Sequence, residues 1–186
     1  MTTTQIKDIQ NEIGVEPDGF WGEKSTDACK KYIRKLMPTG ASGQDQASLT
    51  AAYGKAGDES NLMNLNVVGY GVKYDGKLVK TIRCNAKCAD SLLDVIKELS
   101  TFPEGKATLA DCNGCYNNRP MRGGSLPSLH ARGAAVDFIA GTNANRAHWP
   151  VKATMPFSVI KVFAKHGWLS AGVFWSRDGM HFQKTK

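Results

Sequence analysis

Long apolar stretches are missing from this 186-residue sequence. A helix that crosses a membrane needs about 20 consecutive apolar residues, and no run approaches that length. The first residues, MTTTQIKDIQNEIG, are polar and amphipathic and lack the apolar core of a secretory signal. We therefore expect a protein without a membrane-inserted segment. It would be made in a cytosol and would reach any outside target only after another factor releases it.

The sequence also lacks a run of basic residues interleaved with aromatic ones, the pattern typical of nucleic-acid binding. Its net charge of +7 is unevenly spread. Residues 1–58 hold 7 Lys and Arg against 8 Asp and Glu, a balance of −1, whereas residues 59–186 hold 17 against 9, a balance of +8. The basic excess of the C-terminal part favours encounters with a polyanionic surface. Nucleic acid is not an expected partner.

Internal repeats, low-complexity tracts and phosphate-binding loops are absent as well. Residues 69–71, GYG, lack the further glycines and the following helix of a nucleotide-binding motif. Glycoside hydrolysis needs a suitable pair of carboxylates, but Glu59, Glu98 and Glu104 lie in no recognisable motif. The sequence therefore offers no phosphate-binding loop and no glycosidase motif.

The first third of the chain contains apolar residues at helical spacing. Ile6, Ile9 and Ile13 recur at helical spacing, and Gly14 is placed to end that helix. A turn sequence, PDGFWG, then precedes two more amphipathic segments. The predicted helices cover residues 4–14, 24–36 and 44–54.

This N-terminal segment resembles the three-helix peptidoglycan-binding domain that accompanies many cell-wall hydrolases. The resemblance covers about fifty residues and rests on Ile9-Gln10, on the turn Asp18-Gly19-Phe20-Trp21-Gly22, and on Thr26 with Ala28. It implies a small all-α three-helix domain over residues 1–56 that binds bacterial peptidoglycan, followed by a polar linker over residues 57–66. An unrelated helical module with an Asp-Gly turn is the alternative.

The remainder, residues 67–186, has the pattern of an α+β domain with helices on a small mixed or antiparallel sheet. Alternating apolar residues on either side of Asp75-Gly76 predict a β-hairpin with a two-residue turn. Further along, helices and short strands interchange. The predicted helices cover residues 86–99 and 155–166, and the predicted strands cover residues 107–111, 134–139, 171–175 and 180–183.

Two short stretches of this domain contain metal-binding residue types. SLHARGAAVD, residues 128–137, holds a His and an Asp seven residues apart, and DGMHF, residues 178–182, holds a further Asp and His. A catalytic zinc site uses three protein ligands of the imidazole or carboxylate type and leaves one position open for water. His130, Asp137 and His181 supply such a set. Asp178 is then a carboxylate outside the ligand set, the type of group that moves the proton of the water.

The same strings resemble the D-alanyl-D-alanine carboxypeptidase and L-alanyl-D-glutamate endopeptidase family of zinc peptidases. That family has the pattern SxHxxGxAxD, followed later by an acid shortly before a final His. Ser128, His130, Gly133, Ala135 and Asp137 match the first part, and the DGMH string matches the second. The resemblance covers roughly residues 110–183. It implies a Zn²⁺ cofactor on His130, Asp137 and His181, with Asp178 as general base.

The family also places an arginine upstream of the first ligand, where it stabilises the oxyanion. Arg119 fits that place best, and Arg122 is the competing candidate. Ser128 is expected to contact the substrate or to serve only in a turn, and Trp175 is expected to line the cleft. The segment between Trp168 and the final His lacks the Trp-Gly-Gly stretch of many relatives, so the wall on the substrate side, and with it the bond cleaved, stays open.

A wall-binding module joined to a wall peptidase resembles a phage endolysin. Such a protein would act as a monomer, accumulate in the host cytoplasm and reach the cell wall and periplasm after a holin opens the inner membrane. L-alanyl-D-glutamate endopeptidase activity is favoured, with D-alanyl carboxypeptidase or D-alanyl-diaminopimelate endopeptidase activity as the close alternative. A non-catalytic wall-binding protein and a muramidase are the rivals from other classes.

The cysteines and the remaining histidines allow several readings. Cys84, Cys88, Cys112 and Cys115 have a spacing that permits a structural zinc site, later disulfides or free thiols. Cys29 is expected to be a core residue on a helix. His148 is expected in a loop and His166 at the end of a helix, so neither is expected to be catalytic.

Overall fold

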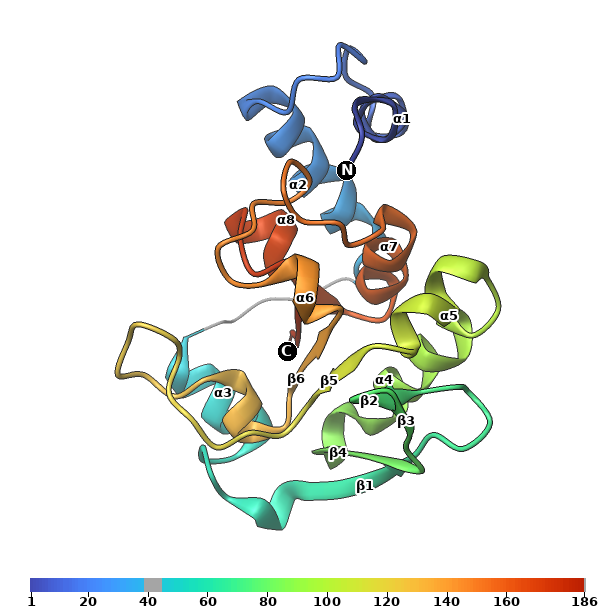
Figure 1. Cartoon of the computed structure of the whole chain (residues 1–186). Coiled ribbons are helices and arrows are strands. Elements are labelled where there is room, and N and C mark those ends of the chain that lie inside the picture. Colours follow the sequence, from blue (N-terminus) through green and yellow to red (C-terminus); the bar gives the residue numbers. More distant parts are fainter. Residues whose placement is uncertain (39–44, 186) are drawn as a thin grey trace.

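The computed structural model describes residues 1–38 and 45–185 (Figure 1). Its first two helices are α1 (Thr3–Ile13) and α2 (Glu23–Leu36), as the periodicity predicts. Thr2 and Gln5 form a reciprocal capping box at the start of α1, and Gly14 ends it in the left-handed conformation at φ 78°. None of the helices in the described ranges is long and apolar enough to cross a membrane.

A buried glutamine holds the turn between α1 and α2. The Gln10 Nε2 group donates to Asp18 Oδ1 at 2.8 Å and to the Phe20 carbonyl at 2.9 Å, and the Gly19 N–H donates back to Gln10 Oε1 at 2.8 Å. Gly19 takes φ 82°, and a Cβ there would meet the Thr3 side chain at 2.5 Å. The Asp-Gly turn is therefore fixed from the neighbouring helix, and it leaves the Phe20 ring 73% exposed.

The helix pair α1–α2 packs against the C-terminal half of the chain. Ile33 of α2 is fully buried in the same apolar cluster as residues of α7 (Phe157–Lys165). The Trp21 ring meets the Trp149 ring edge-on, with 5.4 Å between centroids. One apolar core thus extends from the first helices into the rest of the molecule.

Helix α3 (Gln46–Tyr53) lies apart from α1, at the other end of the molecule (Figure 1). The buried Arg132 side chain holds it there by donating to the Gly54 carbonyl, to Gln46 Oε1 and to Thr50 Oγ1, each at 3.0 Å. The three N-terminal helices therefore do not gather into one bundle. A separate three-helix domain over residues 1–56 is not confirmed.

The segment after α3 enters a strand sooner than its polar composition suggests. A short 3₁₀ helix, η1 (Glu59–Asn61), leads into β1 (Leu62–Asn66), which pairs antiparallel with β4 (Thr81–Asn85). Strand β1 occupies the end of the stretch expected to be a linker. The predicted hairpin is present at its tip, where β2 (Lys73–Tyr74) and β3 (Lys77–Leu78) flank Asp75 and Gly76, both at positive φ.

The main sheet has six strands in the order β3-β2-β5-β6-β8-β7. Only the β2–β5 pair is parallel, so the sheet is mixed, as expected for an α+β domain. Helix α7 packs on the buried face of its central strands, where Phe163 stacks on Phe182 with 3.7 Å between ring centroids, and α4 packs against α7 and the β1–β4 pair. The remaining bounds are β5 (Cys112–Gly114), β6 (Ala135–Phe138), β7 (Trp168–Ser170), β8 (His181–Lys184), α4 (Ala86–Leu99) and α6 (Ala140–Asn143).

Two predicted strands are wrong, because both segments are helical. Residues 107–111 belong largely to α5 (Pro103–Leu109), which starts with proline in its first turn and crosses the end of α4 so closely that a Cβ on Gly105 would lie 2.1 Å from the Leu99 carbonyl oxygen. Residues 171–175 form α8 (Ala171–Trp175). Both are short apolar runs, in which periodicity does not separate a strand from a buried helix.

Candidate metal centre

The three predicted ligands come from adjoining elements of the main sheet. Asp137 on β6 and His181 on β8 are directly opposite each other in the antiparallel register, so their side chains share one face of the sheet. His130 comes from η2 (Leu129–Arg132), the 3₁₀ turn that precedes β6. Sheet register and one turn thus bring together residues that are 51 positions apart in the chain.

The turn η2 is shaped by the residues at its two ends. Ser128 caps it, because its hydroxyl accepts the His130 N–H at 3.3 Å. Gly133 closes it at φ 65°, and a Cβ there would lie 2.7 Å from the Asn85 backbone nitrogen. A side chain at residue 133 would therefore push the turn away from β4 and move His130.

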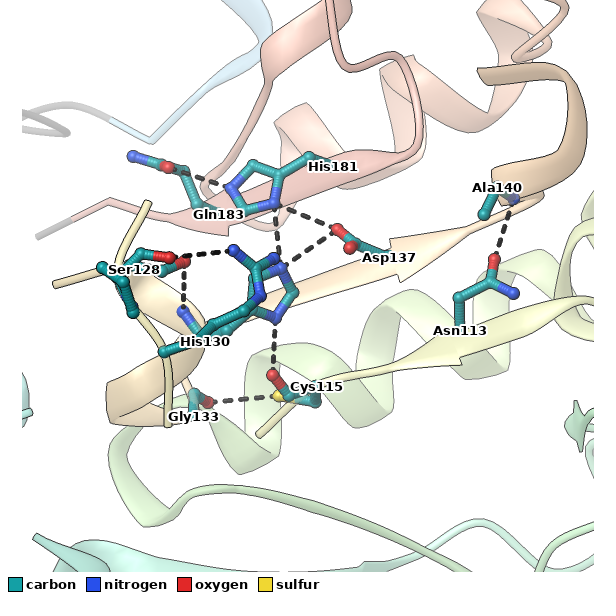
Figure 2. Close-up of polar contacts among 11 residues, drawn as sticks. Asn113, Cys115, Ser128, His130, Gly133, Asp137, Ala140, His181 and Gln183 are labelled. Carbon is teal, nitrogen blue, oxygen red and sulfur yellow. Dashed lines mark hydrogen bonds and ion pairs between the residues drawn. The ribbon is translucent and has the colours of Figure 1, made fainter. Parts of the chain in front are cut away.

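The ligand atoms form a nearly equilateral triangle (Figure 2). His130 Nε2 lies 3.1 Å from Asp137 Oδ1 and 3.1 Å from His181 Nδ1, and the third side, from His181 Nδ1 to Asp137 Oδ1, is 3.0 Å. Tetrahedral zinc with bonds of about 2.0–2.1 Å separates its ligands by about 3.3 Å. The triangle therefore has the size that zinc requires, and all three side chains are buried.

The outer contacts of the two imidazoles orient their electron pairs inward. His130 Nδ1 lies 2.6 Å from the Cys115 carbonyl oxygen, and His181 Nε2 lies 3.1 Å from Gln183 Oε1 (Figure 2). Both partners are acceptors, so each outer nitrogen carries the proton. The inner nitrogens then face each other and the Asp137 carboxylate without a proton in the neutral state. Three converging electron pairs repel one another unless a cation lies among them, so the residues fit a metal ion.

The pKa shifts of Asp137 and His181 also indicate that the ligand triangle attracts positive charge. Burial acts to raise the pKa of the Asp137 carboxyl, but the hydrogen bonds with His130 and His181 outweigh it and hold the pKa well below its usual range. Burial acts to lower the pKa of His181, but the contact with Asp137 and the charge of Asp178 outweigh it and raise the pKa. Without a metal, a proton is the cation that the cluster attracts.

Asp178 lies beside this cluster, outside the ligand set. Its backbone has φ 59°, an uncommon conformation for a residue other than glycine, and its carbonyl accepts the His181 N–H at 2.9 Å. The Oδ1 atom is buried and has no hydrogen-bond partner in the structure. Burial is the main cause of a raised pKa, with a further contribution from the Asp137 charge. A buried carboxylate oxygen without a partner beside a metal centre suits proton transfer.

The ligands lie at the border between two cavities. We call the first, of about 300 Å³, the hairpin-side half-cleft; it is lined by His130, Asp137 and residues that include Tyr74, Asn113, Tyr116 and Asn117. We call the second, of about 580 Å³, the arginine-side half-cleft; it is lined by His181, Asp178 and residues that include Arg122, Leu126, Trp175 and Arg177. Open space therefore continues on both sides of the ligand triangle.

The remaining predicted site residues lie along these half-clefts. Arg119 lines both of them, whereas Arg122 lines only the arginine-side half-cleft. Ser128 lines the same half-cleft but is buried, and its hydroxyl caps η2. Trp175, at the end of α8, is 45% exposed and forms part of the wall there.

The cysteines form no second metal site in the part of the chain that the structure describes. The triangle of His130, Asp137 and His181 is the one group of potential ligands there that is close enough to hold a metal ion. All five cysteines are free thiols and buried. Burial raises the pKa of Cys84 and Cys88 to about 12, so these thiols stay protonated at neutral pH.

The other histidines are away from the ligand triangle. His148 is exposed and lies outside the helices and strands. His166 follows the last residue of α7, and its Nε2 atom lies 3.0 Å from Glu98 Oε2, an ion pair when the imidazole is protonated. Both positions agree with the sequence-based expectation.

Two residues that orient the ligands were not predicted. Gln183 lies two positions after His181 on the same strand, so strand alternation places both side chains on one face, a signal present in the sequence. The Cys115 carbonyl, by contrast, reaches His130 only because β5 pairs with β6 across a register shift. Nothing in the local sequence indicates that contact.

Comparison with known proteins supports a peptidase domain at this site. Residues 122–184, about a third of the chain, match a family model described as D-alanyl-D-alanine carboxypeptidase. The match supports a peptidase domain of that type in this segment. It contains all three ligands and Asp178, whereas Arg119 lies just outside it. No curated protein and no solved structure matches the chain.

Proposed function

We propose that this protein is a zinc-dependent peptidoglycan hydrolase that cleaves an amide bond in the peptide stem. The observation that carries the proposal is the ligand triangle, with both imidazole tautomers fixed inward, at the border of two half-clefts. The peptidase match over residues 122–184 supports amide hydrolysis as the reaction.

His130, Asp137 and His181 would hold the zinc ion. When bound there, the ion would supply Lewis acidity, which polarises the amide carbonyl and lowers the pKa of a coordinated water molecule. The protein contributes a fixed triangle, buried against the sheet, and two outer contacts that keep the imidazoles in the tautomer for binding.

Asp178 is the proposed general base. Its unpartnered Oδ1 atom accepts the proton of the attacking water, and the same carboxyl group then gives that proton to the leaving amine. The raised pKa of Asp178 makes the first transfer easier, because the protonated carboxyl group costs less free energy to reach.

Arg119 is the proposed stabiliser of the oxyanion. It lines both half-clefts, so its guanidinium lies beside the place where the scissile carbonyl would cross from one to the other. A fixed cation near a developing negative charge contributes about 3–4 kcal/mol of transition-state stabilisation in comparable sites. Arg122 lines only one half-cleft, which favours Arg119 for this role.

The two-sided cleft favours an endopeptidase over a carboxypeptidase. An endopeptidase must accommodate substrate on both sides of the scissile bond, whereas a carboxypeptidase needs room for only one residue beyond it. Here space continues past the ligands in both directions. Within the proposal, hydrolysis of the L-alanyl-D-glutamate bond is preferred, and the D-alanyl bonds are the alternative.

The N-terminal helices would hold the enzyme on peptidoglycan, as in a phage endolysin released into the wall by a holin. The resemblance of the first fifty residues supports this role, as does the Phe20 ring, which is 73% exposed at the tip of the Asp18-Gly19 turn. A Phe20→Ala variant should sediment less with purified sacculi while its turnover of a soluble stem peptide stays the same.

Mass spectrometry of digested peptidoglycan tests the reaction and identifies the bond. We expect new amino termini on the stem, loss of activity with a chelator, and recovery when Zn²⁺ is restored. His181→Ala should abolish cleavage, whereas the matched variant His148→Ala, which changes an exposed histidine away from the site, should retain it. New reducing sugars in place of amino termini would identify a muramidase. Full activity under chelation would exclude the zinc mechanism.

A further inference from the structure

The two half-clefts differ in their free charge. On the hairpin side, the Arg83 guanidinium pairs with Glu59 and lies over the Tyr116 ring, 5.5 Å from its centroid. On the arginine side, Arg122 and Arg177 are both exposed, and within the described ranges neither is close enough to a carboxylate to form an ion pair. Two arginines without an ion pair therefore lie on the arginine side alone, while Arg119 is a further cation that borders both half-clefts.

The acidic residues of the arginine-side half-cleft, Asp45 and Asp178, form no ion pair with these cations. Asp45 is engaged as the N-terminal cap of α3, where its carboxylate accepts the Ser48 N–H at 2.9 Å. Asp178 forms no ion pair with either arginine, and the charge of Arg122 affects its pKa less than the charge of His181 does. Two guanidinium groups thus remain available to an anionic group of the substrate.

Arg177 is held next to the proposed base. It precedes Asp178 directly, and the residues on both sides of it, Ser176 and Asp178, have positive φ values of 55° and 59°. The turn is anchored at its end, where the Asp178 carbonyl accepts the His181 N–H. A group bound by Arg177 is therefore close to the scissile bond.

We propose that Arg177, with Arg122 beside it in the same half-cleft, binds the free carboxylate of an acidic residue on the amine side of the scissile bond. This inference rests on the proposed function, and it adds which half-cleft holds each side of the scissile bond. In the preferred substrate the amine-side residue is D-glutamate, which is linked through its side chain and so keeps a free α-carboxylate. Guanidinium groups bind carboxylates with paired hydrogen bonds that an ammonium group does not reproduce.

The same assignment places the sugar-bearing side of the stem in the hairpin-side half-cleft. Its lining includes the rings of Tyr74 and Tyr116 and the amides of Asn113 and Asn117. Aromatic faces with neutral hydrogen-bonding groups suit a lactyl-sugar and its acetamido substituents, whereas free cations suit an acid. Arg177 would therefore determine specificity without taking part in proton transfer.

Two synthetic stem peptides test this inference. They share the L-alanyl bond to the second residue, but one carries D-glutamate there and the other D-isoglutamine, in which a carboxamide replaces the α-carboxylate. With zinc-loaded wild-type protein we expect kcat/KM to favour the acid by about ten- to hundred-fold, the usual range for a hydrogen bond to a charged group. Arg177→Gln should lower kcat/KM much more for the acid than for the amide, so the preference falls toward one. Arg177→Lys should restore only part of it.

Arg146→Gln is the matched control, because Arg146 is an exposed arginine that lines neither half-cleft. It should keep the full preference of the wild type, and zinc content should be equal in all variants. Cleavage of both peptides without preference, or an equal loss on both in Arg177→Gln, would overturn the role of Arg177 and leave the peptidase proposal standing. Cleavage of neither peptide by wild-type protein would overturn both the role of Arg177 and the preference for the L-alanyl-D-glutamate bond.

Discussion

Among single residues, Asp178 combines features that a merely structural carboxylate rarely has. It is half-buried, its Oδ1 atom has no partner, and its backbone is in the left-handed region. A carboxylate that only stabilises the fold would be expected to have hydrogen-bond partners for both oxygens and an unstrained backbone conformation. The combination is better explained by a group that must exchange a proton with substrate.

Asp178→Asn therefore separates chemistry from metal binding. The amide keeps the size of the carboxylate but does not accept the proton, so we expect kcat to fall by about 10²- to 10⁴-fold. Zinc content, measured by atomic absorption, should match the wild type because Asp178 is outside the ligand set. Wild-type turnover in this variant would show that another group acts as the base.

Gln183 offers a second test at this scale. Its Oε1 atom holds the proton-bearing nitrogen of His181, so Gln183→Ala should weaken zinc affinity by about 10- to 100-fold. Competition with a chromophoric chelator measures this, with Gln5→Ala, in the cap of α1, as a control that should bind zinc normally. Equal affinities in both variants would show that the imidazole orientation does not depend on Gln183.

The ligand set itself could be predicted from sequence, because the residue types and their order restrict the chemistry strongly. The contacts that orient the ligands could be predicted only in part. Gln183 follows from strand alternation, whereas the Cys115 carbonyl depends on the register shift between β5 and β6. The division of the cleft into two half-clefts could not be predicted, because segments far apart in the chain line each of them. The same is true of the position of Arg177 in one half-cleft without an ion pair.

Among helices and strands, the amphipathic helices were the predictable elements. α1, α2, α4 and α7 have long apolar stripes, and all four end within one residue of the bound expected from sequence. The errors fell on α5 and α8, which are seven and five residues long. Over such lengths local propensity is weak, and packing against α4 or β8 decides the conformation.

Helices α4 and α7 are linked by Glu98, which gives a prediction about pH. Its carboxylate accepts from Lys165 Nζ at 2.7 Å and contacts His166 Nε2 at 3.0 Å. Burial acts to raise the pKa of Glu98, but these two partners outweigh it and lower the pKa below its ordinary value of 4.5. A lowered pKa means that the stabilisation is fully present above that ordinary value and is lost as pH falls through the folded-state value.

We therefore expect Glu98→Gln to lower the urea midpoint at neutral pH and to have a smaller effect near pH 3. Urea titrations of both proteins at the two pH values measure the difference. Glu104→Gln, which changes another carboxylate in the neighbouring helix α5, is the control and should show no comparable pH dependence. An equal effect of Glu98→Gln at both pH values would mean that its ion pairs contribute nothing.

For the molecule as a whole, the N-terminal helices and the peptidase segment share one apolar core. Ile33 on α2, Leu49 on α3 and Phe163 on α7 belong to a single cluster of buried residues. The sequence suggested two units joined by a linker because local composition changes near residue 57. Burial between distant helices leaves no mark in local composition, so the shared core was not predictable.

Ile33→Ala tests whether this shared core unfolds as one unit. Truncating a fully buried isoleucine costs about 2–5 kcal/mol. In a single cooperative unit the loss should lower the unfolding midpoint equally by tryptophan fluorescence and by release of bound zinc. Ile13→Ala, at the partly exposed end of α1, should have a smaller effect. A midpoint of zinc release unchanged in Ile33→Ala would show that the helices α1 and α2 unfold on their own.

The two half-clefts draw on different stretches of the chain, the hairpin side on residues 74–119 and the arginine side mainly on residues 119–129 and 171–183. A change in one stretch can therefore alter the preference on that side while the metal ligands and the opposite wall remain as they are. For evolution, under the proposed function, this means that preference for one end of the substrate could change while preference for the other end is kept. For protein engineering, the residues of the turn from Trp175 to Arg177 can be substituted to change substrate preference while Asp178, the proposed base, is kept.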